Sequence, residues 1–307
     1  MEQTPGRSFR HRFEGPFFRR LFVGGIRNIP QPIQRVSMPF WAGFFFAFLS
    51  DARHRAERNL EQILGPANPF GEQWRTFRLF VNYAQTLTNM YALHLGQGLP
   101  VEVDFQGREN VLRVIEGGRG VVAVTGHLGA WQLMPFLIER GTGVALPAMT
   151  MAMAEEPNAQ VSEFEKQFRS KFRVVYTTRS PFALLELHRV LERREIVGMQ
   201  LDRHPGGAHV MIPFCGRLAP FPVGPAMLAR TAQCPIIPVF AISPTPDRKR
   251  VTIHYEKPIE VPKTRDRDAD ISAAMHKVVA VYEDYVRRYP DQWFNFYDFW
   301  RSPGESS

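Results

Sequence analysis

Hydrophobic positions in the first third of the chain recur at steps of three and four residues, which is the period of an amphipathic helix. This pattern predicts helices over residues 53–64 and 72–95. Between them, Gly65-Pro66 and the stretch from Pro69 to Gly71 interrupt the pattern, as turn residues do. The apolar stripe of the second helix consists of Trp74, Phe77, Phe80, Ala84, Leu87 and Tyr91.

Beyond Pro100 the pattern changes to short apolar runs that alternate with helical stretches. Strands are predicted at residues 101–105, 121–124, 173–176, 196–201, 210–213, 236–242 and 251–255. Helices are predicted around residues 130–140, 157–171, 181–194, 223–232 and 271–289. The alternation predicts an α/β fold with a mixed, mainly parallel central sheet that is flanked by helices.

The charge of the chain is concentrated at its start. The 307 residues include 38 Lys+Arg and 30 Asp+Glu, which gives a net charge of +8. Residues 1–35 contain seven arginines and two acidic residues and therefore carry +5 of that charge. A Phe-rich apolar run follows at residues 39–49, shorter than the roughly 20 apolar residues that a spanning helix needs.

Arginines beside an aromatic run are typical of an interfacial anchor, in which rings enter the lipid and guanidinium groups contact phosphates. We therefore expect a helical membrane-association segment at the N-terminus. The predicted division is a basic, Phe-rich docking segment over 1–50 and an α/β domain over 51–307, with a helical lead-in at about 51–97. The alternative is a core helix beneath the domain, preceded by a disordered basic tail.

The sharpest candidate for chemistry is His127, which follows the apolar strand 121–124 and Thr125-Gly126. The carboxyl ends of strands are where open α/β sheets bind ligands, and an imidazole there can act as a base near neutral pH. Gly126 and Gly129 on either side would let a substrate come close. The alternative is a solvent-facing or hydrogen-bonded structural histidine.

Two further segments contain candidate residues. Asp202 and Arg203 follow the apolar strand from Ile196, where the carboxylate could orient a protonated His127 and the arginine could hold an anion. An ion pair or a turn-capping aspartate is the structural alternative. The stretch over 212–225 could form an anion-binding loop before a helix, or its prolines could simply fix the helix entry.

Several of these blocks, taken in order, resemble the bacterial lipid A biosynthesis acyltransferase family, within the lysophospholipid acyltransferase superfamily. Its first motif has a histidine, four residues and then an acid, and here it is similar to Gly126-His127-Leu-Gly129-Ala-Trp131-Gln132. The other similar blocks are Arg58-Asn59-Leu60, Asp202 to Gly207, Val210 to Arg217, Gly224-Pro225-Ala226, Pro235 to Val239, and Gln292 to Trp300.

The resemblance implies a membrane-associated enzyme that moves a fatty acyl chain from an acyl thioester to a hydroxyl or amine of a lipid or glycolipid. The donor would be acyl carrier protein or coenzyme A, with no further cofactor and no metal, and His127 would be the general base. It also implies the cytoplasmic face of the cell inner membrane. The expected substrate-binding residues are Gly126, Gly129, Trp131, Arg203, Phe214, Gly216, Arg217 and Gly224.

The chain departs from the family at Gln132, where the motif has an acid. A glutamine can accept a hydrogen bond from the imidazole, but it cannot offset the positive charge that forms on the ring. Three interpretations follow: an active transferase whose acid is Asp202, a transferase whose acceptor needs less base strength, or a catalytically degenerate relative that binds lipids or anions. The expected catalytic set is His127, Asp202 and Gln132.

Other classes of protein fit the sequence less well. The Gly118 to Ala123 stretch precedes its strand, whereas a dinucleotide-binding fingerprint follows one, and no Gly-x-Ser-x-Gly is present. Asp202, His204 and His209 match no familiar zinc spacing. Cys215 and Cys234 are too few for a disulfide framework, and we expect both to be buried. A basic nucleic-acid-binding module is disfavoured because no such motif occurs.

Overall fold

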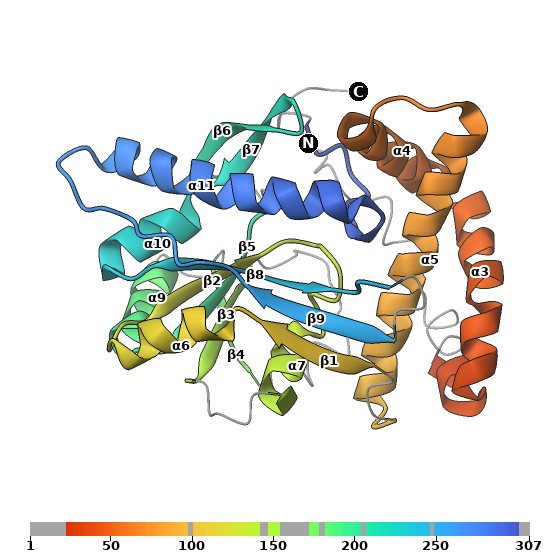
Figure 1. Ribbon diagram of the computed structural model, residues 1–307, viewed down its shortest axis with the longest axis horizontal. Coiled ribbons are helices and arrows are strands. Elements are labelled where there is room, and N and C mark those ends of the chain that lie inside the picture. The colour runs from red at the N-terminus through yellow and green to blue at the C-terminus, as the bar shows by residue number, and fades with distance from the viewer. Residues whose placement is uncertain are drawn as a thin grey trace. The chain divides into compact units, whose positions relative to one another are not determined.

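The computed structural model describes residues 23–97, 101–141, 147–153, 172–177, 182–203, 207–245 and 249–300. These residues form two compact units. The first contains the chain before Val101 together with Tyr289–Phe299, and the second contains Val101–Arg288 together with Trp300. Figure 1 labels the helices and strands of both.

The first unit consists of the helices α3 (Gln31–Phe48), α4 (Ser50–Leu64) and α5 (Pro69–His94) and the short 3-10 helix η1 (Pro290–Gln292). Helices α4 and α5 confirm the two predicted in this region, and both begin three residues earlier than predicted. Asn68 caps α5, because its side-chain oxygen accepts the N–H of Gly71 at 2.8 Å. Pro69 occupies the first helical position, where a missing N–H costs nothing.

The first and the last of the sequence blocks that resemble the family are in contact inside this unit. The buried amide of Asn59 donates to the carbonyls of Asn295 at 3.0 Å and Tyr297 at 2.8 Å. Beside it, Arg58 forms an ion pair with Asp298 at 2.6 Å. The Arg58-Asn59-Leu60 block therefore anchors the aromatic C-terminal block, although about 240 residues separate them in the sequence.

Helix α3 divides its apolar residues between a packed side and an exposed side. The ring of Phe46 contacts the rings of Phe77 and Phe80 on α5, at 5.7 and 5.5 Å between centroids. Val36 and Phe40, in contrast, are 83% and 73% exposed. The exposed large apolar residues of the helix are Ile33, Val36, Phe40, Trp41, Phe44 and Phe48. Among the described residues, no helix is long and apolar enough to cross a bilayer.

The second unit contains a seven-stranded sheet in the order β1-β9-β8-β2-β5-β3-β4. Its strands are β1 (Glu102–Gln106), β2 (Val121–Thr125), β3 (Met149–Met153), β4 (Arg173–Tyr176), β5 (Ile196–Gln200), β8 (Ile236–Ile242) and β9 (Arg250–Tyr255). Neighbouring strands pair in parallel except β8 and β9, which are antiparallel. The predicted mixed, mainly parallel sheet is therefore confirmed.

Helices cover this sheet, as predicted. They are α6 (Arg108–Glu116), α7 (Met134–Gly141), α9 (Ala183–Glu192), α10 (Gly224–Ala232) and α11 (Arg267–Arg288). Figure 1 shows α10 and α11 on one side of the sheet and α6 and α7 on the other. The strand β8 at its centre is buried along its whole length, as expected for a strand with helices on both faces.

The anion-binding loop considered over 212–225 is an antiparallel hairpin instead. Strands β6 (His209–Phe214) and β7 (Arg217–Pro222) pair with Phe214 opposite Arg217. The two turn residues, Cys215 and Gly216, have positive φ angles of 50° and 83°, as a tight two-residue hairpin turn requires. The prolines of this segment are tolerated because a two-stranded ribbon leaves many backbone N–H positions unpaired.

The sequence patterns also missed some elements. Helix α6 and strands β3 and β7 were not predicted. The helix predicted over 157–171 lies outside the described residues. Both cysteines are buried, and that burial raises the pKa of each thiol to about 12, which fits the expected packing role.

Candidate active site

His127 and Asp202 arrive side by side because the strands that precede them are parallel neighbours. In the register of β2 and β5, Thr125 lies opposite Gln200, and each candidate residue comes two positions later. The N–H of Leu201 donates to the carbonyl of Thr125 at 2.8 Å, which continues the pairing beyond the strand ends. The site thus lies at the carboxyl edge of the sheet, where α/β proteins bind ligands.

The two side chains form a buried hydrogen-bonded pair. Nδ1 of His127 lies 2.8 Å from Oδ1 of Asp202, and the backbone N–H of His127 donates to Oδ2 at 2.7 Å. The residues are 5% and 1% exposed. With the carboxylate ionised, Nδ1 carries the ring proton, so Nε2 of the neutral ring is an acceptor.

The environment keeps the Asp202 carboxylate charged. Burial alone raises the pKa of this group, but the charge of His127 and its ring hydrogen bond act in the opposite direction. Hydrogen bonds from Tyr282 and from the backbone N–H of His127 add to that effect. The net result is a pKa well below the ordinary value, so the carboxylate is an anion at neutral pH.

Tyr282 is the member of this cluster that the sequence did not indicate. It lies in α11, and its hydroxyl donates to Oδ2 of Asp202 at 2.6 Å. Its side chain is fully buried. Its ring stacks against Phe214 and Phe240, with centroid separations of 5.7 and 5.8 Å. Nothing in its sequence position distinguishes it from the other core residues of the helix.

Three of the residues predicted to bind substrate are tightly packed against other parts of the protein. A Cβ on Gly126 would overlap the hydroxyl of Tyr282, so only glycine fits at this position. Gly129 has a φ of 61°, and a Cβ there would overlap the carbonyl oxygen of Ala241. Phe214 is fully buried, and it is a core residue stacked on Tyr282.

Trp131 and Gln132 follow the histidine in the same motif. The ring of Trp131 lies 5.1 Å from that of His127, and its side chain is 8% exposed. The side-chain oxygen of Gln132 is buried and accepts no hydrogen bond from the described residues. Gln132 therefore does not accept the hydrogen bond from the imidazole that a glutamine there could accept, and Asp202 accepts it.

The remaining predicted residues are Arg203, Gly216, Arg217 and Gly224. Arg203 follows Asp202 with an exposed side chain, and Gly216 and Arg217 are exposed next to the buried turn residue Cys215. Gly224 is the first residue of α10. Their roles in substrate binding stay predictions.

A cavity of about 650 Å³ opens on the sheet face next to α7. Thr125, the last residue of β2, lines one part of it and lies two positions before His127. The lining is mainly apolar, and it includes the methionines Met134, Met149, Met151 and Met199. Flexible, unbranched methionine side chains adapt to irregular apolar ligands.

The structure describes only two of the three residues considered for zinc. Among the residues that it describes, no group of three His, Cys, Asp or Glu side chains could hold a metal. Of the three residues considered, Asp202 is engaged by His127 and Tyr282, and His204 lies outside the described residues.

Comparison with known proteins agrees with the resemblance in the motifs. A search of curated proteins found no match. Among solved structures, the chain is similar to the 1-acyl-sn-glycerophosphate (LPA) acyltransferase PlsC from Thermotoga maritima, at 15% identity and a TM-score of 0.36. That match covers 84% of this chain and 98% of PlsC. The sequence profile of the bacterial lipid A biosynthesis acyltransferases matches residues 7–302, so the chain belongs to this family and is an acyltransferase.

Proposed function

We propose that the protein transfers a fatty acyl chain from an acyl thioester to a hydroxyl or amine of a membrane lipid or glycolipid, with His127 as general base. The donor is acyl carrier protein or coenzyme A carrying the chain. The observation that carries this proposal is the buried pair in which Oδ1 of Asp202 accepts from Nδ1 of His127. With Nδ1 engaged by the carboxylate, Nε2 is the ring nitrogen that would take the proton of the acceptor group.

The proposed reaction follows from that arrangement. Nε2 takes the proton of the acceptor hydroxyl or amine while its oxygen or nitrogen attacks the carbonyl carbon of the thioester. The C–S bond then breaks, and the departing thiolate takes the proton back from the imidazolium. Asp202 stays ionised throughout and offsets the positive charge on the ring, which a neutral glutamine at position 132 cannot do.

The cavity beside Thr125 supports a long apolar substrate. Its mainly apolar lining suits an acyl chain better than a sugar or a nucleotide, since polar ligands need convergent hydrogen-bonding groups. In this proposal the chain lies in the cavity and the thioester lies near His127. The acceptor then approaches from the carboxyl edge of the sheet.

Helix α3 supports membrane docking. Its exposed residues recur at four-residue steps at Val36, Phe40, Phe44 and Phe48, so they form one apolar stripe. The arginines of residues 1–20 precede it in the sequence and lie outside the described residues. We propose that this region docks on the cytoplasmic face of the inner membrane. We expect binding to anionic vesicles; salt-sensitive binding to duplex DNA without vesicle binding would contradict this part.

The test of the activity is acyl transfer from a labelled acyl thioester to a lipid extract. His127→Ala should abolish transfer, and His276→Ala, which removes an exposed histidine on α11, should leave it intact. Transfer that survives in His127→Ala would contradict the general base. A wild-type protein that binds lipid but transfers no acyl chain from either donor would favour the degenerate relative.

A further inference from the structure

The hydroxyl of Tyr282 is a buried polar group for which the reaction above assigns no role. We propose that Tyr282 is a positioning residue, whose O–H holds the Asp202 carboxylate in the orientation that presents Oδ1 to Nδ1 of His127. This inference rests on the proposed function, because it concerns the same catalytic pair. It adds a third residue, from a helix that none of the site motifs includes.

The hydrogen bonds around Asp202 divide the work between its two oxygens. Oδ1 lies 2.8 Å from the His127 ring nitrogen. Oδ2 accepts from the Tyr282 hydroxyl at 2.6 Å and from the His127 backbone N–H at 2.7 Å. A carboxylate rotates readily about its last side-chain bond. Two donors on Oδ2 remove that freedom and fix where Oδ1 points.

The phenol is itself held rigidly. The ring is fully buried and stacks against Phe214 of β6 and Phe240 of β8, each at an interplanar angle of 20°. A side chain locked by packing loses little further entropy when it makes a hydrogen bond, so it is preorganised for one orientation. Tyr282 therefore supports the catalytic carboxylate from the core of the second unit.

Gly126 makes this contact possible. A Cβ at that position would overlap the hydroxyl and the ring of Tyr282. An alanine would therefore push the phenol away from Asp202, although the added methyl lies outside the catalytic pair itself. The glycine before the motif histidine and the tyrosine 156 positions later thus form one structural feature.

The hydroxyl also affects how strongly the pair binds protons. A hydrogen bond donated to a carboxylate stabilises its charged form and so lowers its affinity for a proton. Of the groups that lie near Tyr282 along α11, Arg287 forms an ion pair with Glu283 at 2.8 Å. The Tyr285 hydroxyl donates to Glu256 at 2.5 Å. Removal of the Tyr282 hydroxyl should therefore make the His127–Asp202 pair bind protons more tightly.

The test compares two tyrosines on one helix. Tyr282→Phe keeps the ring and removes the hydroxyl, and Tyr285→Phe removes a hydroxyl that donates to the carboxylate of Glu256. We expect kcat of Tyr282→Phe to fall about tenfold with KM unchanged, and the acidic limb of its kcat/KM profile to move to higher pH. Tyr285→Phe should match the wild type in both. Identical rates and pH profiles for the two variants would overturn the proposal.

A double-mutant cycle separates positioning from general structural support. In the Asp202→Asn background, Tyr282→Phe should cause no further loss, because the carboxylate that it positions is gone. An equal fold loss in both backgrounds would overturn the proposal. If Tyr282→Phe does not fold, 3-fluorotyrosine at position 282 keeps the hydrogen bond and makes the phenol a stronger donor. The acidic limb should then move to lower pH, and an unchanged limb would contradict the inference.

An NMR titration of the His127 ring keeps this inference distinguishable from the proposed function. The ring should titrate at higher pH in Tyr282→Phe than in the wild type, whatever reaction the protein catalyses. If no variant or wild type transfers acyl chains but this difference appears, the proposed function fails and the positioning stands. If transfer depends on His127 but the ring titrates alike in both proteins, the positioning fails alone.

Discussion

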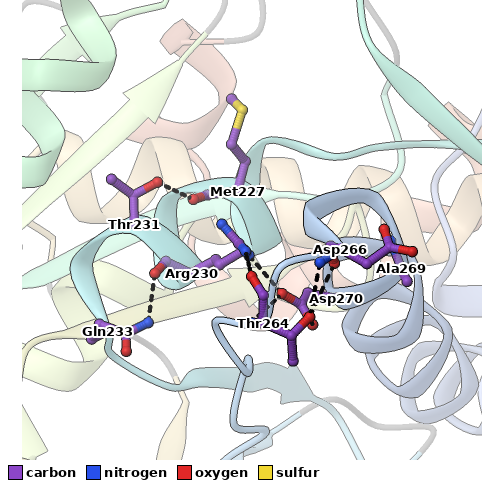
Figure 2. Close-up of polar contacts among 8 residues, drawn as sticks. All are labelled: Met227, Arg230, Thr231, Gln233, Thr264, Asp266, Ala269 and Asp270. Atoms are coloured by element: carbon purple, nitrogen blue, oxygen red, sulfur yellow. Dashed lines mark hydrogen bonds and ion pairs between the residues drawn. The ribbon is translucent and has the colours of Figure 1, made fainter.

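Asp202 and Asp270 are two buried aspartates in the second unit, and they differ in what surrounds them. Asp270 is 4% exposed and accepts hydrogen bonds from Nε of Arg230 at 2.9 Å, from the Thr264 hydroxyl at 2.9 Å and from the Thr264 backbone N–H at 2.8 Å (Figure 2). Asp202 likewise has a nitrogen-containing side chain that can carry a positive charge, a hydroxyl donor and a backbone N–H. The two sites are nearly alike in the number and type of contacts.

The difference is whether the partner can exchange a proton. A guanidinium does not exchange its proton at physiological pH, so the pair of Arg230 and Asp270 can only hold structure. The pair joins α10 to the first turn of α11, where Asp270 lies. Arg230 also donates to the carbonyl of Thr264, just before α11, at 2.7 Å. An imidazole, unlike a guanidinium, can take up and release a proton in the pH range where enzymes work. Burial and hydrogen bonds hold both aspartates in place. Only Asp202 has a partner that can exchange a proton, so only that pair can take part in acid–base chemistry.

The largest effect that would test this comparison is on activity. Asp202→Asn should lower the rate of acyl transfer by roughly 10³–10⁴-fold, because an amide cannot offset the imidazolium and can favour the wrong ring tautomer. Asp270→Asn should leave the rate per folded molecule unchanged. The measurement is the initial rate of transfer from a labelled acyl thioester at a temperature where both variants are folded. Equal rate losses in the two variants would erase the distinction.

Asp270→Asn should lower the stability of the protein, although it should leave the reaction rate unchanged. Asp270→Asn leaves the Arg230 guanidinium without its carboxylate and weakens the link between α10 and α11. We expect its melting temperature to fall by about 5 °C or more. Thermal unfolding followed by circular dichroism measures this, with Asp268→Asn on the exposed side of α11 as the matched control. A melting temperature equal to that of the control would contradict the structural role.

The sequence predicted most of the second unit because its strands are strongly patterned. The bounds of β4 and β8 were predicted to the residue, since β8 is a continuous apolar run, β4 contains two adjacent valines, and a polar residue follows each strand. Helix α6 was missed because its nine residues are fewer than the window over which a helical period can be judged, although Val111, Leu112, Val114 and Ile115 recur at helical steps. Strand β3 was missed because Met-Thr-Met-Ala-Met contains a single β-branched residue.

The part of the candidate site that could be predicted is the part that follows directly from where strands end in the sequence. His127 and Asp202 both follow apolar strands, so each could be placed at the carboxyl edge of a sheet. That β2 and β5 are direct neighbours depends on the strand order, which sequence periodicity does not contain. Tyr282 could not be found because, in a helix of buried apolar residues, it has the pattern of a core aromatic.

The pH dependence of stability tests the ion pair between Arg230 and Asp270. Burial raises the pKa of Asp270, but the hydrogen bonds from Arg230 and Thr264 outweigh it and leave that pKa lowered. A carboxylate with a lowered pKa stabilises the fold fully above the unfolded value near 3.9 and loses this contribution as pH falls further. The melting temperature of Arg230→Gln should therefore differ most from the wild type at pH 6–7, and the difference should shrink below about pH 4. The exposed Arg265→Gln is the control of equal charge.

The smallest expected effect separates the donors around Asp270. Thr264→Val keeps the shape of the side chain and the backbone N–H, and it removes only the hydroxyl that donates to Oδ1. Because Arg230 and the backbone still hold Oδ2, the melting temperature should fall by only about 2–3 °C. The equivalent hydroxyl at Asp202 belongs to Tyr282, and its removal should change the rate and the pH profile of the reaction. We expect Thr264→Val to leave the acyl-transfer rate unchanged. A loss of rate as large as that expected for Tyr282→Phe would mean that a hydroxyl beside the Arg230–Asp270 pair controls the reaction. The two aspartates would then not be functionally separate.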